Sequence, residues 1–273
     1  MTYRLFDTHT HFDVPDFDQD REHLAYAAKA VGVERLILIG FIQSRFQDLL
    51  NTQQFLAQLV DAPTGYLAPG LHPFYIEQHE MEHLNHLENL LKNEKCIAIG
   101  EIGLDTFLKQ HKHPETFKKQ KEFFVAQLEL AQHFNKPVLL HIRKAHADTL
   151  ALLKQQHFKQ GGIAHAFSGG VEEAKALVKL GFKIGVTGQI TNPNAKKLHA
   201  VVQEIGVEHL VLETDCPDMT PLCCQRSIEQ RTRNTPANLP YVLMGLAQSL
   251  NLEIDLLAEQ VWQNSLQALK LEF

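Results

Sequence analysis

The sequence is poor in cysteine and in long apolar runs, and it carries no excess of positive charge. Cys96, Cys216, Cys223 and Cys224 show neither zinc-finger spacing nor a dense disulfide pattern, so a reducing compartment suits the chain. The longest apolar runs, such as LILIG, are too short to span a membrane, and no secretory signal is visible before Asp7. We therefore expect a soluble, cytoplasmic protein with no membrane association and no evident protein partner.

The charge balance limits the kinds of partner. A formal net charge of −6 argues against a large basic surface that wraps duplex nucleic acid through many phosphate contacts. It still permits a pocket in which bound cations supply positive charge locally. The contents of 44% hydrophobic and 21% charged residues are typical of a globular protein with a substantial core.

Short apolar runs alternate with longer polar segments of helical periodicity. Strands are predicted at residues 3–9, 33–40, 64–71, 95–103, 136–142, 161–167, 182–188 and 209–215. Amphipathic helices are predicted at 20–32 and 171–181, each ending at a glycine, and at 114–135, which begins with a proline. This alternation favours an α/β fold, a (β/α)₈ TIM barrel forming a single domain over residues 1–273. The alternative is an open doubly wound sheet, but no G-x-G-x-x-G motif follows the first strand.

Polar residues follow the apolar part of most predicted strands. Residues two apart on a strand point to the same side, so His9 and His11 can chelate one metal ion. The later strand ends carry His72, Glu101, Asp105, His141, Arg143, His165, Ser168, Glu213 and Asp215. In a (β/α)₈ barrel these ends meet on the face that holds the active site. Burying so many polar groups is costly unless they are paired or bind a metal, so we predict a metal site there.

A second pair of histidines, His111 and His113, has the same spacing within the stretch KQHKHPE. With 16 histidines in the chain, about one such pair is expected by chance. Because lysines surround this second pair, we interpret it as part of a solvated loop.

Seven motifs resemble, in order and spacing, those of the TatD-type metal-dependent hydrolases of the amidohydrolase superfamily. They are DTHTHFD, GLHP, GEIGLD, HIR, HAFSGG, ETDCPD and RNTPANLPYVL, and they extend from Asp7 to about Leu243. The chain departs from the family's usual pattern at Ala166, Cys216 and Thr235, where the family often has cysteine, alanine and glutamate. None of these departures removes a predicted metal ligand.

The resemblance implies two divalent metal ions bridged by Glu101. One ion would be held by His9, His11, Glu101 and Asp215, and the other by Glu101, His141 and His165. Histidine with carboxylate suits zinc, manganese, iron or cobalt, whereas magnesium prefers oxygen ligands and water. The identity stays open among zinc, manganese and magnesium. Asp215 and Glu101 are the implied catalytic residues, with Asp215 orienting the attacking water and taking its proton. A plain ligand role for Asp215 is the alternative.

The remaining polar residues each allow two interpretations. His72 and Ser168 either contact a substrate phosphate or satisfy a helix end or a loop. Arg143 either neutralises phosphate or binds Glu101 or Asp105 structurally. We expect Asp105 and Glu213 to orient the metal-binding histidines.

The stretch after the last predicted strand is long, and long loops in compact domains are commonly functional. Its arginines, Arg226, Arg231 and Arg233, either meet a nucleic-acid backbone or form a solvated loop. Cys216 is interpreted as a packing residue rather than a soft metal ligand. Cys223 and Cys224 suggest no function.

These residues predict an enzyme, a metal-dependent hydrolase acting on ester bonds. The favoured activity is that of a deoxyribonuclease of exonuclease type, whose substrate is single-stranded or end-containing DNA or a small phosphodiester. One alternative is hydrolysis of a carboxylic ester or amide, such as an aminoacyl-tRNA ester, and another is metal binding without turnover. Glu101, in place of the lysine that several amide and phosphotriester hydrolases carry on strand four, favours the TatD type.

Overall fold

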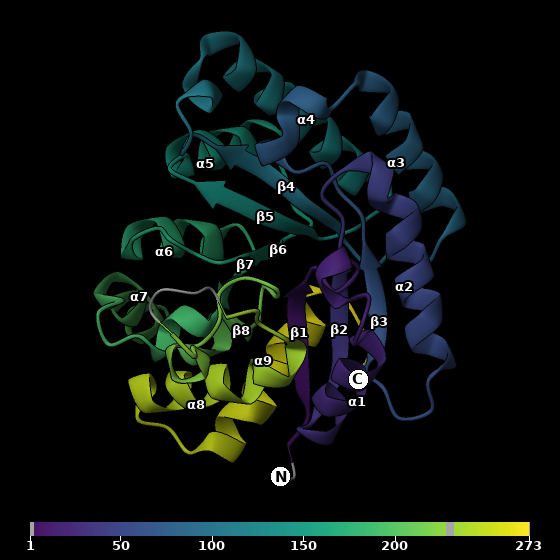
Figure 1. The fold of residues 1–273 in the computed structure, drawn as a ribbon. Coiled ribbons are helices and arrows are strands. Elements are labelled where there is room, and N and C mark those ends of the chain that lie inside the picture. The colour runs from purple at the N-terminus through teal and green to yellow at the C-terminus, as the bar shows by residue number, and fades with distance from the viewer. Residues whose placement is uncertain (1–2, 228–231, 273) are drawn as a thin grey trace.

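The computed structural model describes residues 3–227 and 232–272, where strands alternate with helices along the chain (Figure 1). The strands are β1 (Leu5–Thr10), β2 (Val33–Ile39), β3 (Thr64–Ala68), β4 (Ile99–Asp105), β5 (Val138–Arg143), β6 (Gly162–Ala164), β7 (Phe182–Val186) and β8 (Leu210–Leu212). The α-helices are α1 (Arg21–Ala30), α2 (Phe46–Gln58), α3 (Met81–Asn93), α4 (Pro114–His133), α5 (His146–Gln155), α6 (Val171–Lys179), α7 (Lys196–Ile205), α8 (Leu239–Leu250) and α9 (Ile254–Ala268). The predicted strands and the three predicted helices are all present.

The strands pair in parallel and in sequence order, which is the arrangement of a barrel. Ladders join β1, β2 and β3 in one group and β4 to β8 in another. Single parallel bridges, Leu67 with Cys96 and Thr10 with Cys216, connect the two groups at both seams. The ring therefore closes as the predicted (β/α)₈ barrel, and the open doubly wound sheet is excluded.

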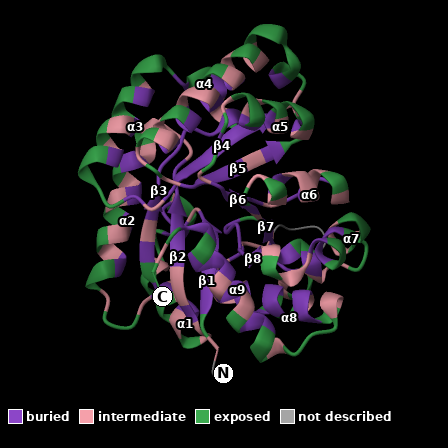
Figure 2. Ribbon diagram, turned by 180° about the vertical axis from the view of Figure 1, so that it is seen from behind, coloured by how far each residue is buried: buried purple, intermediate pink, exposed green. Residues whose placement is uncertain are grey.

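Alternate residues of each strand serve two different parts of the core. In β2, Leu36 and Leu38 pack in the large cluster beneath the surrounding helices. Ile37 and Ile39 instead belong to a smaller cluster inside the barrel, to which β1, β5, β6 and β8 also contribute. Burial on both faces explains why the strands are apolar runs rather than alternating patterns. Figure 2 shows buried strands enclosed by helices whose outer faces are exposed.

Helix α9 closes one end of the barrel. Its Trp262 and Leu266 join the interior cluster, and the guanidinium of Arg4 lies 4.6 Å from the centre of the Trp262 ring. The carboxyl ends of the strands lie at the other end, which leaves that end for a site. Among the residues described, no helix combines the length and the apolar character needed to cross a membrane.

Three glycines bring the backbone into direct contact where β2 and β3 end and β4 begins. A Cβ on Gly40 would lie 2.8 Å from the Gly70 nitrogen, and one on Gly70 would lie 2.6 Å from the Gly100 carbonyl carbon. Only glycine permits such close approach. The N–H of Glu101 donates to the Gly40 carbonyl at 2.8 Å, so this contact holds Glu101 at the barrel mouth.

Candidate metal centre

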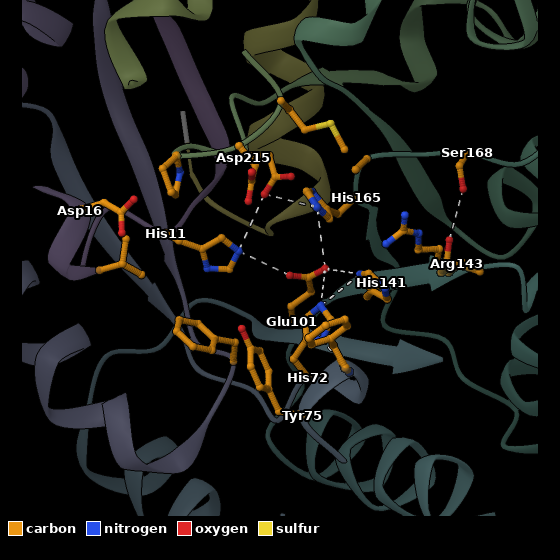
Figure 3. A pocket seen from close by; sticks show the side chains of 18 residues that line it. His11, Asp16, His72, Tyr75, Glu101, His141, Arg143, His165, Ser168 and Asp215 are labelled. Carbon is orange, nitrogen blue, oxygen red and sulfur yellow. Dashed lines mark hydrogen bonds and ion pairs between the residues drawn. The ribbon is translucent and has the colours of Figure 1, made fainter. Parts of the chain in front are cut away.

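The six residues predicted as metal ligands converge at the carboxyl ends of the strands. They are His9 on β1, His11 just after it, Glu101 on β4, His141 on β5, His165 after β6 and Asp215 after β8. Five of them line a cavity of about 740 Å³, as Figure 3 shows, and His9 lies fully buried against them.

Glu101 stands at the centre of this group, with its two carboxylate oxygens facing different partners. Oε2 lies 3.2 Å from His9 Nε2 and 3.7 Å from His11 Nε2. Oε1 lies 2.7 Å from His141 Nδ1 and 3.7 Å from His165 Nε2. A single carboxylate therefore joins two sets of imidazoles.

Asp215 connects the same two sets from the opposite side. Its Oδ1 lies 3.8 Å from both His9 Nε2 and His11 Nε2, and 3.6 Å from His165 Nε2. Its backbone is left-handed, with φ of 53°, and its N–H donates to the His9 carbonyl at 2.9 Å. The end of β8 is thereby tied to β1, which directs the carboxylate into the cluster.

His9 and His11 present neutral imidazoles to these carboxylates. Burial lowers the pKa of His9 well below its ordinary value, and the neighbouring His165 lowers it further. Burial also lowers the pKa of His11 to about 4, although Glu101 acts in the opposite direction. Both ring nitrogens of His9 are buried without a hydrogen bond, even though Nε2 is so close to Glu101.

The chemistry of this first set fits a cation. Ligand atoms about 2.1 Å from one tetrahedral metal ion lie about 3.0–3.5 Å apart. The 3.2 Å between His9 Nε2 and Glu101 Oε2 falls within that range, and the other contacts are slightly longer. Neutral imidazoles facing carboxylates without hydrogen bonds are the donor set that zinc or manganese prefers. His9, His11 and Asp215 form one group whose ligand atoms could hold an ion together.

The second set carries protons that a cation can replace. Burial disfavours the charged form of His141, but Asp105 and Glu101 outweigh it and raise its pKa to about 9. Burial also opposes the charge on His165, whose pKa is nevertheless raised to about 10, first by Glu213. Both histidines would therefore be protonated at neutral pH in the absence of metal ions.

Asp215 also tends to hold a proton when no metal ion is bound. Burial raises its pKa to about 8, opposed by His165 and reinforced by Glu101, Glu213 and Asp218. Of the three imidazoles that face Asp215, His9 and His11 are neutral, and the charge on His165 alone does not keep the acid ionised at neutral pH, so further positive charge is lacking. A divalent cation supplies that charge, so the residues present fit the metal site predicted from the sequence.

Asp105 and Glu213 hold the rings of the second set, as the sequence predicts. Asp105 Oδ2 lies 3.0 Å from His141 Nε2, and Asp105 Oδ1 accepts the Phe107 N–H at 2.7 Å. Glu213 Oε1 lies 3.0 Å from His165 Nδ1 and accepts the Ala166 N–H at 2.6 Å. In each case the carboxylate orients one ring nitrogen and leaves the other facing the cavity.

His72 lies within the cluster rather than at its rim. Its Nε2 is 3.2 Å from Glu101 Oε1 and 3.1 Å from His141 Nδ1. Its Nδ1 accepts the Phe74 N–H at 2.9 Å, so the predicted capping contact is also present. His72, Glu101 and His141 form a further group that could hold a metal ion, a role that the sequence did not suggest.

Ser168 and Arg143 line the cavity, and each has a partner in the protein. The Ser168 hydroxyl lies 3.5 Å from the Ile142 carbonyl. The Arg143 guanidinium lies 3.6 Å from the centre of the Phe107 ring. The structural partner of Arg143 is thus an aromatic ring, not the carboxylate of Glu101 or Asp105 expected in the structural interpretation.

The interpretation of the second histidine pair as a solvated loop is wrong for His111. Its side chain is buried, with Nδ1 3.6 Å from Asp105 Oδ1 and its ring edge-on to Phe74 at 5.5 Å. The short 3₁₀ turn Gln110–Lys112 directs the ring inward while Lys112 and His113 are exposed. The lysines near His111 in the sequence made the whole stretch look exposed, so the sequence pattern did not indicate that this one side chain is buried.

Two of the three arginines of the long loop, Arg226 and Arg233, are among the described residues, and neither lines the cavity at the metal centre. Arg233 forms an ion pair with Asp20 and lies 5.0 Å from the centre of the Phe17 ring. The Arg233 guanidinium therefore interacts with other residues of this chain, which does not favour a contact with a nucleic-acid backbone. Arg226 is exposed, and Arg231 lies outside the described residues.

The cysteines near this loop behave as packing and surface residues. Cys216 is buried and its carbonyl accepts the His11 N–H at 2.9 Å, in line with the packing interpretation. The sulfurs of Cys223 and Cys224 lie 3.9 Å apart.

Three aromatic residues that the sequence analysis missed, Phe41, Phe74 and Tyr75, line the cavity of about 740 Å³ at the metal centre. We call these residues the aromatic wall and this cavity the catalytic cavity. The centre of the Tyr75 ring lies 5.4 Å from that of Phe41 and 5.3 Å from that of Phe74. Phe41 meets the His11 ring edge-on at 5.4 Å. Their positions directly after strand ends, in GF and HPFY, were the available signal.

Comparison with known proteins assigns the family. The model of the TatD related DNase family matches residues 6–270. The chain belongs to the TatD family. A protein of Escherichia coli (strain K12) named "uncharacterized metal-dependent hydrolase YjjV" is 38% identical over 222 residues, which cover 80% of this chain and 82% of that protein. The chain is also similar to a protein of Pantoea sp. (strain At-9b) named "3'-5' ssDNA/RNA exonuclease TatD". It is 32% identical over 271 residues, 98% of this chain and 100% of that protein.

A solved TatD-family structure has the same fold. The crystal structure of YjjV, a TatD homologue from Escherichia coli K12, matches with a TM-score of 0.87 and 32% identity, covering 100% of both chains. As a TatD-family protein, this chain is a metal-dependent hydrolase built on a (β/α)₈ barrel.

Proposed function

We propose that this chain is a two-metal phosphodiesterase that acts as an exonuclease on single-stranded or end-containing nucleic acid. The observation that carries the proposal is the position of Glu101, whose two oxygens face separate sets of imidazoles. Two-metal sites of this kind suit phosphodiester hydrolysis because both the attacking and the leaving oxygen need stabilisation. The name of the Pantoea relative, an exonuclease, supports the same substrate class.

In this proposal each side chain has a defined role. His9, His11, Glu101 and Asp215 hold one ion, and Glu101, His141 and His165 hold the other, with His72 beside the second. Bound zinc, manganese or magnesium would lower the pKa of a water molecule and offset the charge of the phosphate. Asp215, whose side chain is 12% exposed towards the cavity, orients the attacking water and accepts its proton. Ser168 and Arg143 bind the phosphate oxygens from the other side of the cavity.

The aromatic wall supports a nucleotide substrate over a small carboxylic ester. Aromatic side chains beside a phosphate site provide faces on which bases stack, independent of base identity. Phe74 is 41% exposed although it lines the cavity, so its ring is available to a ligand. Figure 3 shows Tyr75 on the same side of the cavity as His72.

Replacing Phe74 with alanine should weaken the binding of the terminal base of the substrate. Because stacking contributes about 1–3 kcal/mol per base, we expect kcat/KM on single-stranded DNA to fall about tenfold. An oligonucleotide whose terminal nucleotide is abasic should be cut equally by the variant and the original protein. Tyr241→Ala, which removes an aromatic ring of similar exposure (42%) on α8, is the matched control. An equal loss on both substrates would contradict the stacking role.

Binding of metal ions should release protons, because His141 and His165 have pKa values raised to about 9 and 10 without metal. At pH 7 both rings carry a proton that must leave before the facing nitrogen can coordinate. We therefore expect affinity for manganese to rise by up to about tenfold per pH unit and per proton between pH 6 and pH 8. Titration calorimetry of metal-free protein in buffers of different ionisation enthalpy measures the proton count directly. A count of zero would mean that these histidines are not ligands.

A substrate panel tests the proposed activity. Metal-free protein is supplied with manganese, magnesium or zinc and offered single-stranded DNA, duplex DNA, bis(4-nitrophenyl) phosphate and an aminoacyl-tRNA. We expect metal-dependent cleavage of single-stranded DNA and of the simple diester. Cleavage of the aminoacyl ester alone would replace the proposal with ester hydrolysis. Metal binding without turnover on any substrate would indicate a binding protein.

A further inference from the structure

A second cavity of about 350 Å³ adjoins the catalytic cavity on the side of β6 and β7. Ala166, Ser168 and Met219 line both cavities, so the two meet along these residues. Most of the remaining lining comes from the residues after β7 and from the beginning of α7, and includes Gln189 and Asn194. Because Ser168 lines both cavities, a linear substrate bound over the metal centre can continue across Ser168 into this space.

The two cavities differ in charge. The catalytic cavity contains the carboxylates of Asp16, Glu101, Asp215 and Asp218. The second cavity is lined by Lys196 and Lys197, and no carboxylate is among the residues that line it in the described part of the chain. A pocket lined by two lysines, in a protein of net charge −6, is suited to an anion.

Lys197 is held at the boundary between the cavities. Its Nζ donates to the Ser168 carbonyl at 3.0 Å, which uses one of the three donors of the ammonium group. The side chain interacts electrostatically with Glu173, but Glu173 Oε2 already accepts the Gly170 N–H at 2.8 Å. In the described part of the chain the other two donors of Lys197 make no hydrogen bond, so they stay available to a ligand that passes over Ser168.

We propose that this second cavity binds the phosphate one nucleotide away from the bond that is cut. The inference rests on the proposed nuclease function and extends it. A nucleic-acid strand places a further negative charge one nucleotide along, whereas a simple diester has only the phosphate at the metal centre. Lys196 and Lys197 bind that second phosphate, with Gln189 and Asn194 offering amide donors beside it. The bound group is either an internal diester or a terminal monoester.

The test compares substrates that differ only in their phosphates. Thymidylyl-thymidine has one phosphate, and versions with an added 5′ or 3′ terminal phosphate or an added third nucleotide have two. We expect one end to matter, with kcat/KM about tenfold higher when that end carries the second phosphate, as monoester or diester. The end that matters identifies which side of the cut bond enters the second cavity.

Lys196→Ala/Lys197→Ala should abolish this advantage and leave kcat/KM on bis(4-nitrophenyl) phosphate unchanged. The slope of log kcat/KM against log salt on a two-phosphate substrate should become shallower by about 0.7 for the lost phosphate contact. Lys197→Arg, which keeps the charge, should retain most of the advantage. Lys154→Ala/Lys179→Ala removes two exposed lysines, one from α5 and one from α6, and is the control for net charge. Thermal unfolding of each variant checks that the fold is intact.

The outcomes separate this inference from the activity on which it rests. If one-phosphate and two-phosphate substrates are cut equally well, or if the double lysine variant keeps the advantage, the second cavity is not a phosphate site although the enzyme is a nuclease. If neither diester class is cut with any metal, the nuclease proposal fails and this inference fails with it.

Discussion

Asp215→Asn is expected to lower kcat on single-stranded DNA about 1,000-fold, within the range lost when a general base is removed. The amide has nearly the same shape and keeps one oxygen facing His9, His11 and His165, but it cannot take a proton from water. Metal content should therefore fall much less than turnover. Steady-state kinetics and elemental analysis of the same preparation measure both quantities. Bis(4-nitrophenyl) phosphate should show the same loss, because the defect lies in the chemical step.

Asp16→Asn is the matched control, because Asp16 also lines the catalytic cavity but its carboxylate lies outside the metal cluster. Undiminished turnover by Asp215→Asn on every substrate would eliminate the proton-accepting role. Parallel loss of metal and turnover would assign Asp215 the role of a ligand only, which is the alternative that the sequence left open.

Glu101→Gln should have the larger effect on metal binding. Each oxygen of Glu101 faces its own set of imidazoles, and an amide leaves an oxygen for one set only. Its NH₂ group would point at a ring nitrogen that needs its lone pair for the metal. We expect the variant to hold no more than one ion per chain after dialysis and to lose measurable nuclease activity. Stabilisation of the fold by added manganese should also shrink, because the stabilisation that a ligand provides grows with its affinity for the folded protein.

Glu213→Gln provides a graded comparison. Glu213 contacts His165 but not the proposed metal positions, so the loss of affinity should be about 10–100-fold rather than complete. If Glu101→Gln binds two ions as tightly as the original protein, Glu101 does not bridge them and the two-metal proposal is wrong.

The convergence of the polar side chains at the metal centre could be predicted from two regularities of the sequence, whereas their assignment as metal ligands came from the resemblance to the TatD type. Apolar runs locate the strands, and the polar residues at their carboxyl ends must share one face once the barrel closes. The contact of His72 with His141 could not be predicted, since it depends on the turn Pro73–Gln78 after β3. The burial of His111 and the pairing of Arg233 with Asp20 join segments whose distance in space no local pattern records.

The aromatic wall and the second cavity show a related limit. Phe41, Phe74 and Tyr75 are ordinary residues of a globular protein until the loops after β2 and β3 place them around one opening. Lys196 and Lys197 begin an amphipathic helix and would be taken for solvated charges on the sequence alone. The role proposed for Lys196 and Lys197 depends on the other residues of the second cavity, which come together only in the tertiary structure.

The contact of Gly40, Gly70 and Gly100 has a consequence for laboratory evolution of this enzyme. Any side chain at one of these glycines collides with the backbone of its neighbour or, for Gly100, with Leu139, so no single substitution there can be accommodated without moving the scaffold. Randomised libraries should leave all three codons untouched. Diversity is better directed to Phe74, whose exposed ring can be exchanged without disturbing a strand. Substrate range and barrel integrity can then be varied independently, although Phe74 lies close to Gly70 in the sequence.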